Sequence, residues 1–300
     1  MTAAPTGALR KAVLALAVLA VFWGYNWVTM KQAMIDSGPL DFSAFRFGIG
    51  ALTLAPVMLF LKAPFRIPRG EWRTVAWLSF LLVANFGFVM TALIAGGAGK
   101  ISVLVYTMPF WGLILARFML HEHLKAWQWW SVGLAFAGLV ILIDPLHQQG
   151  SVISSVLAVV AGLFWAGSVV IVKEMQRRES LPMITLTFWQ ISIGAIGFLL
   201  AGLVFPQRTI TWTPLLIWCI FYSAVISTAV AWLLFYYALK RMPAGLAGLG
   251  TLATPVVGVL SAWWILGERP SSIEATGMAL IGAALATLAA VPIIAKKSNG

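Results

Sequence analysis

Long apolar stretches separated by short polar turns run along almost the whole chain. Read with a window of about 19 residues, the pattern predicts an all-α membrane protein with ten transmembrane helices, at residues 12–32, 40–61, 72–94, 98–119, 126–143, 151–172, 182–205, 212–239, 243–266 and 272–294. The strands of an outer-membrane barrel would alternate apolar and polar residues. Residues 152–172 are continuously apolar, which excludes that class.

Composition agrees with the hydrophobic pattern. Of the 300 residues, 61% are hydrophobic and 10% are charged, whereas about 25% of the residues of a soluble domain are charged. A water-soluble globule is therefore excluded. Ten spans of about 20 residues would use about 200 residues, which leaves no room for a soluble domain between them.

The net charge of +11 does not indicate a nucleic-acid partner, because the basic residues are not gathered in one motif. They lie beside hydrophobic ends, where they can face anionic membrane lipids. The single cysteine, Cys219, has no partner for an intrachain disulfide or a cysteine metal cluster. The oligomeric state is left open.

Lysine and arginine also predict the orientation, because cytoplasmic loops retain them. With the N-terminus inside, fifteen basic residues fall on the inner side and four on the outer side, namely Lys31, Lys100, Arg208 and Arg269. Arg46 lies inside the second span. We therefore expect a multi-pass protein of the plasma (inner) membrane with both termini cytoplasmic. Lys31, Arg46 and Lys100 could attract a substrate carboxylate, but snorkelling to lipid headgroups is the favoured interpretation.

The two halves of the sequence resemble each other. At an offset of 146, six residues of the first half recur in the second: Ala98, Gly99, Pro109, Gly112, Leu120 and Glu122 return as Ala244, Gly245, Pro255, Gly258, Leu266 and Glu268. The pattern predicts two five-helix units, residues 12–143 and 151–294. An odd number of spans inverts the second unit in the membrane, an arrangement typical of secondary transporters.

These residues carry a family resemblance. Tyr106-Thr107-Met108-Pro109 with Leu120-His121-Glu122 in the first half, and Pro255 with Leu266-Gly267-Glu268-Arg269 in the second, resemble the EamA-type repeat of the drug/metabolite transporter superfamily. His121 departs from the glycine common there. The resemblance implies ten helices, cytoplasmic termini and a central cavity lined by spans one, three, four, six, eight and nine. Several members export amino acids or related metabolites, and aromatic amino acid exporters are the most similar type.

Prolines and tryptophans occupy equivalent positions in the two units. Pro109 and Pro255 lie within spans, where each removes a backbone hydrogen bond, so we expect both to act as hinges. Trp23 and Trp165 lie near the predicted midplane, away from the interfaces that tryptophan prefers. They could form an aromatic wall for a small organic substrate, and the alternative is a lipid-facing or core-filling role.

Further substrate-binding candidates lie in spans that the resemblance places around the cavity. They are Asn26, Asn85, Tyr106, Ser168, Thr228, Trp232 and Tyr236. An amide inside a membrane is costly unless it is paired, so a structural role between helices is the alternative for Asn26 and Asn85. Together the candidates predict an aromatic pocket with few hydrogen-bond donors.

The chemistry that the spans lack narrows the function further. No carboxylate lies at the predicted membrane centre, where a proton-coupled exporter of cationic drugs would need one. His121 and His123 flank Glu122 in a loop without the spacing of a helical zinc motif, and no phosphate-binding motif is present. We therefore expect no enzymatic activity and no cofactor or metal.

The combined prediction is a secondary transporter that exports small metabolites by alternating access. Because a zwitterion needs no central carboxylate, the expected substrate is a neutral, preferably aromatic, amino acid. Two alternatives stay open: export of another class, such as a nucleoside, sugar or drug-like compound, and a membrane assembly partner that transports nothing.

Overall fold

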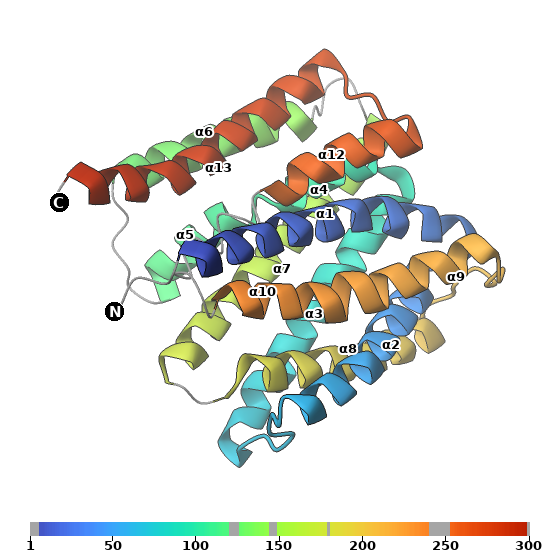
Figure 1. The fold of residues 1–300 in the computed structure, drawn as a ribbon. Coiled ribbons are helices and arrows are strands. Elements are labelled where there is room, and N and C mark those ends of the chain that lie inside the picture. The colour runs from blue at the N-terminus through green and yellow to red at the C-terminus, as the bar shows by residue number, and fades with distance from the viewer. Residues whose placement is uncertain (1–5, 120–125, 144–148, 179–180, 240–252, 299–300) are drawn as a thin grey trace.

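The computed structural model describes residues 6–119, 126–143, 149–178, 181–239 and 253–298. Within these ranges all regular secondary structure is helical, as the apolar stretches predict. The elements shown in Figure 1 are α1 (Thr6–Asp36), α2 (Pro39–Phe60), η1 (Arg69–Glu71), α3 (Trp72–Ala95), α4 (Ala98–Val105), α5 (Met108–Met119), α6 (Ala126–Ile143), α7 (Gln149–Arg177), α8 (Met183–Val204), α9 (Pro214–Phe221), η2 (Tyr222–Val230), α10 (Ala231–Leu239), α12 (Ala253–Leu266) and α13 (Ser272–Ser298).

Eight helical segments of the described chain are long and apolar enough to cross a membrane, and two shorter apolar helices, Ala253–Leu266 and Ser272–Thr287, follow them. The protein is therefore a multi-pass membrane protein. The eight segments correspond to the first eight predicted spans. The count of ten stays a prediction, and the first part of the predicted span 243–266 lies outside the described residues.

Large apolar side chains cover much of the molecular surface. Trp264 is 91% exposed, Phe60 86% and Trp130 80%. A soluble monomer rarely exposes contiguous apolar patches of such extent, whereas acyl chains would cover them. Trp130 and Trp264 also belong to the tryptophans at predicted span ends, where aromatic belts form.

The helices pack in pairs that bring the two halves of the sequence together. Helix α2 packs against α8, and α6 packs against α13. These two pairs lie on opposite sides of the bundle, with α1 and α10 between them (Figure 1). The backbones of α6 and α13 approach closely at Gly138 and Gly277. A Cβ on Gly138 would lie only 2.8 Å from the Gly277 carbonyl oxygen. Small residues permit such crossings in membranes.

The predicted fourth span is broken into two helices. Helix α4 ends at Val105 and α5 begins at Met108. Pro109 has no N–H to donate to the Val105 carbonyl, and its ring crowds the preceding turn. The break therefore lies on the N-terminal side of the proline. Its counterpart Pro255 is the third residue of α12, directly after residues that lie outside the description.

The predicted eighth span is not a uniform α-helix either. Its central segment η2 has π-helical geometry and connects α9 to α10. Such widened turns are rare and frequently occur at functional sites. In η2 the Thr228 hydroxyl donates to the Ser223 carbonyl five residues earlier, at 2.8 Å.

Candidate functional site

Trp23 lies in an aromatic group between α1 and α10. Its ring centroid lies 6.0 Å from that of Trp232 in an edge-to-face arrangement and 6.0 Å from that of Phe235. Its indole Nε1–H donates to the Ser227 carbonyl of η2 at 2.9 Å. The partly buried indole therefore has a hydrogen-bond partner, and the η2 backbone helps to fix its orientation.

A polar cluster lies one helical turn further along α1. The Asn26 carboxamide oxygen accepts from the Ser223 hydroxyl at 2.7 Å and from the Thr29 hydroxyl at 3.2 Å. Asn26 is 4% exposed, and both hydroxyl residues are fully buried. This cluster connects α1 to η2, so in this conformation Asn26 connects two helices.

The second aromatic group involves the other half of the chain. Tyr106, at the break between α4 and α5, meets Trp165 of α7 edge-to-face, with 5.4 Å between ring centroids. Asn85 of α3 is 6% exposed and its amide donates to the Ala161 carbonyl of α7 at 2.7 Å. Ser168, one turn beyond Trp165, is 9% exposed.

The candidates are thus divided between two places in the bundle. Among the described residues no ring contact joins Trp23 to Trp165; each tryptophan instead packs on an aromatic residue from another helix. Thr228 lies in η2, next to Gly50 of α2. The Tyr236 side chain lies outside the description.

On the predicted outer side, Lys31 of α1 caps the end of α3. Its ammonium donates to the Leu93 carbonyl at 2.5 Å, the Gly96 carbonyl at 3.0 Å and the Ile94 carbonyl at 3.2 Å. The last carbonyls of a helix have no partners within it and carry partial negative charge. The cation therefore stabilises this helix end and ties α1 to α3.

Glu268, which follows α12, caps the start of α4, the helix that comes after α3 in the chain. Its two carboxylate oxygens accept from the Ala98 and Gly99 amides of α4 at 2.9 and 3.1 Å. The N-cap Gly97 provides no side-chain cap of its own. A Cβ on Gly97 would lie 2.9 Å from the carboxylate, so a larger residue would displace Glu268.

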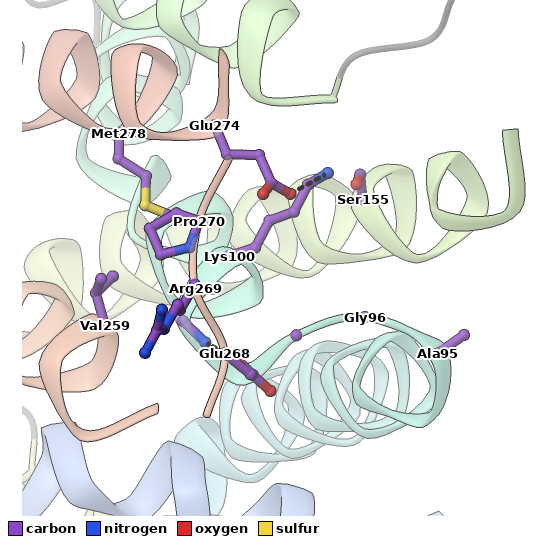
Figure 2. Close-up of a pocket in the computed structure, with 12 residues that line it drawn as sticks. Ala95, Gly96, Lys100, Ser155, Val259, Glu268, Arg269, Pro270, Glu274 and Met278 are labelled. Atoms are coloured by element: carbon purple, nitrogen blue, oxygen red, sulfur yellow. Dashed lines mark hydrogen bonds and ion pairs between the residues drawn. The ribbon is translucent and has the colours of Figure 1, made fainter. Parts of the chain in front are cut away.

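A pocket of about 300 Å³ opens beside these two caps. Lys100 and Glu274 form an ion pair of 3.2 Å along one side of it and bridge α4 to α13, while Glu268 lies on the other side (Figure 2). Arg269 and Ser155 also line it. None of the predicted substrate-binding residues whose side chains the structure describes lines this pocket. In the described part of the chain, no group of three or more His, Cys, Asp or Glu residues could hold a metal.

The snorkelling interpretation of the outer cations is wrong for two of the three. Lys100 is 7% exposed and Arg46 is 6% exposed, so neither side chain reaches the lipid headgroups. Both side chains point into the bundle, where Lys100 finds a carboxylate. Charge counting predicts the side of the membrane but not the direction of a side chain on its helix.

Sequence reasoning missed Ser223, Thr29 and the capping role of Glu268. Glu268 carried a signal, because it belongs to the six residues that recur between the halves. Ser223 and Thr29 carried none, since a hydroxyl in a span more often bonds to its own helix.

Known proteins resemble this chain over nearly its whole length. The EamA-like transporter family model matches residues 10–144 and again residues 152–290. An Escherichia coli protein named "Probable amino-acid metabolite efflux pump" is 28% identical, over 91% of this chain and 92% of its own length. A Bacillus subtilis protein, "Uncharacterized transporter YoaV", is 25% identical, over 86% of this chain and 90% of its own.

A solved crystal structure shares the fold, with a TM-score of 0.67 at 19% identity, over 92% of this chain and 96% of that one. The family and the relatives' names indicate a transporter rather than an enzyme. Because the family model matches both halves of the sequence, the chain belongs to the EamA-like transporter family.

Proposed function

We propose that this protein is a secondary transporter that exports small metabolites across the inner membrane by alternating access, and that it prefers neutral, aromatic amino acids. The observation that carries the proposal is the combination of aromatic and polar groups around α1, where Trp23 and Trp232 lie beside the buried Asn26–Ser223 cluster. Aromatic faces suit an apolar side chain, and hydroxyl and amide groups suit the polar end of an amino acid.

Three further observations support this substrate class. The E. coli relative is named as an amino-acid metabolite efflux pump. The sequence places no carboxylate at the centre of a span, where a site for organic cations would need one. Trp23 and Trp165 provide one aromatic surface in each half.

Alternating access is proposed on the basis of the repeat. The family model matches the chain twice, close to the predicted units 12–143 and 151–294. Helices α2 and α8 have 22 residues each and start 144 residues apart, and they pack against each other. Two units that pack through equivalent helices suit an exchange between two opposite open states.

The caps and the ion pair on the predicted outer side support an assignment of the conformational state. Lys31 ties α1 to α3, and Glu268 ties the end of α12 to α4. The Lys100–Glu274 pair adds a contact between α4 and α13. We assign the conformation to an outward-closed state, in which these three polar contacts hold the outer ends of the helices together.

Purified protein in liposomes tests the proposal. A panel of radiolabelled amino acids, nucleosides, sugars and amine drugs would be added to vesicles that contain the protein and to protein-free vesicles. We expect faster movement of phenylalanine and tryptophan than of small neutral amino acids. Preference for another class would replace the substrate assignment. No movement of any compound would favour an assembly partner and overturn the transporter proposal.

A further inference from the structure

Arg46 is a cation enclosed inside the membrane-spanning bundle. It lies in the second turn of α2, and 6% of its surface is exposed. Its guanidinium lies 4.7 Å from the ring centroid of Phe86 on α3 and 5.2 Å from that of Phe47. Aromatic faces stabilise a cation partially, but they do not satisfy its N–H donors.

The hydrogen bonds of this guanidinium are largely unmet. A guanidinium has five N–H donors, and the one hydrogen bond that the described residues provide joins Nη1 to the Met30 thioether sulfur at 3.0 Å, a weak acceptor. The buried Nε finds no partner among the described residues. None of the ion pairs in the described part of the chain includes Arg46. A buried charge without a counter-ion is strongly unfavourable, so the site is incomplete without an anion.

Arg46 borders the candidate substrate site. Met30, its sulfur contact, lies one helical turn from Asn26 on α1. Gly50, one turn from Arg46 on α2, lies next to Thr228, because a Cβ on this glycine would be 3.2 Å from the Thr228 Cγ2. The residue of α1 that contacts the cation therefore lies one helical turn from the polar cluster that the proposed function uses.

The second half of the chain provides an internal comparison. At the offset of 144 that relates α2 to α8, Arg46 corresponds to Gln190, and Gly50-Ala51 corresponds to Gly194-Ala195. The neutral Gln190 amide donates to the Leu78 carbonyl of α3 at 3.0 Å. Helix α8, the equivalent of α2, thus packs on α3 without a cation at this position. Only the first half of the chain has a cation there.

We propose that Arg46 binds the carboxylate of the transported substrate. The proposal rests on the proposed transport function and narrows it to substrates that carry a carboxylate, which excludes nucleosides, neutral sugars and simple amine drugs. A guanidinium matches a carboxylate through two parallel hydrogen bonds, which would satisfy the donors that are unmet here. In the outward-closed conformation the site is enclosed, so the substrate enters and leaves when the bundle opens.

The test compares matched ligands and matched variants. Binding and vesicle transport of L-phenylalanine and of L-phenylalaninamide, which lacks the carboxylate, would be measured for wild type, R46Q, R46K and Q190A. R46Q installs the residue that the second half carries at the equivalent position. We expect R46Q to bind phenylalanine on the order of tenfold or more weakly, as loss of a charge-assisted contact predicts, with amide binding unchanged. R46K should retain part of the preference, and Q190A should leave the ratio of the two ligands unchanged.

Thermal stability separates this role from a purely structural one. Because wild type encloses an unpaired charge, R46Q should unfold at an equal or higher temperature without ligand. A lower unfolding temperature together with equal losses for both ligands would make Arg46 structural and overturn the proposal. Unchanged phenylalanine binding in R46Q would also overturn it.

The two proposals fail in different ways. If wild type transports only compounds without a carboxylate, the Arg46 proposal fails while the transporter function stands. If no compound crosses, the transport function fails. In that case phenylalanine that binds wild type but not R46Q would still support the anion site, and absence of phenylalanine binding would overturn it.

Discussion

At the scale of single residues, several buried polar side chains of this membrane protein have a partner on another helix. Asn26 and Asn85 both connect helices, as their structural interpretation anticipated. Neither bond excludes a role with substrate, because an amide has further donor and acceptor sites. Trp165, by contrast, has its described ring contact only with Tyr106, and it provides the more selective test.

Trp165→Ala should reduce transport of phenylalanine and tryptophan about twofold to tenfold more than transport of small neutral amino acids. The reason is the loss of aromatic contacts, each worth about 0.5–1.5 kcal/mol beyond area burial. Initial rates in proteoliposomes measure the effect. Trp264→Ala is the matched control, because Trp264 is 91% exposed on the predicted lipid face. Equal reduction for all substrates would make Trp165 structural.

At the scale of elements, opposite charges hold the turn between α3 and α4. Lys31 occupies the end of one helix and Glu268 the start of the next. Each charge matches the partial charge of the helix end that it caps. Since Lys31 comes from α1 and Glu268 from the α12–α13 connection, the turn is tied both to another helix of the first half and to the second half of the chain.

Glu268→Gln should loosen the outer closure. It removes the negative charge from the α4 N-terminus and costs about 1 kcal/mol, or about fivefold in the population of the closed state. A cysteine at Ser155, which is 1% exposed in the pocket wall, would report this change through faster reaction with an impermeant maleimide added outside. Glu174→Gln serves as control, because it disrupts an exposed pair with Arg178 that is worth little. Equal labelling of the parent and the Glu268 variant would contradict the closure.

Pro109→Ala should restore a donor for the Val105 carbonyl and allow α4 and α5 to join. We expect the free energy of unfolding to rise by about 1 kcal/mol. We also expect the transport rate to fall, because a continuous helix would no longer allow α4 and α5 to change their relative orientation. Thermal unfolding and initial rates measure the two effects. Pro56→Ala is the control, since Pro56 lies inside α2 without breaking it. A variant with an unchanged transport rate would exclude the hinge.

At the scale of the whole molecule, α1 begins and α13 ends on the same side of the bundle (Figure 1). The excess of basic residues predicts that this side is cytoplasmic. The same assignment places the Glu268 and Lys31 caps on the outer side. The proposed outward-closed state therefore depends on the proposed orientation in the membrane.

A cysteine introduced at Gly300, with Cys219 replaced by serine, should react with an impermeant maleimide only after the cells are permeabilised. The native Cys219 is fully buried, so its replacement removes a minor background. A cysteine at Arg269, on the predicted outer side and exposed, is the matched positive control. Labelling of position 300 in intact cells would reverse the assigned orientation.

The apolar segments, the basic bias of the loops and the repeat can be read directly from the sequence. These are local or periodic properties: a run of about 20 apolar residues is suited to a bilayer whatever its neighbours are. The break before Pro109 was also predictable, because a proline acts on its own turn. The first eight spans and the family follow from these features.

The contacts between side chains of different helices, by contrast, become visible only in the folded molecule. Trp23 pairs with Trp232 rather than with Trp165, and Arg46 points between Phe47 and Phe86 rather than to the headgroups. Such pairings depend on the rotation of each helix about its axis and on its crossing with helices more than 200 residues away in the chain. Hydropathy does not encode that rotation in a chain where both lipid and core are apolar, so packing between small residues and polar contacts sets it.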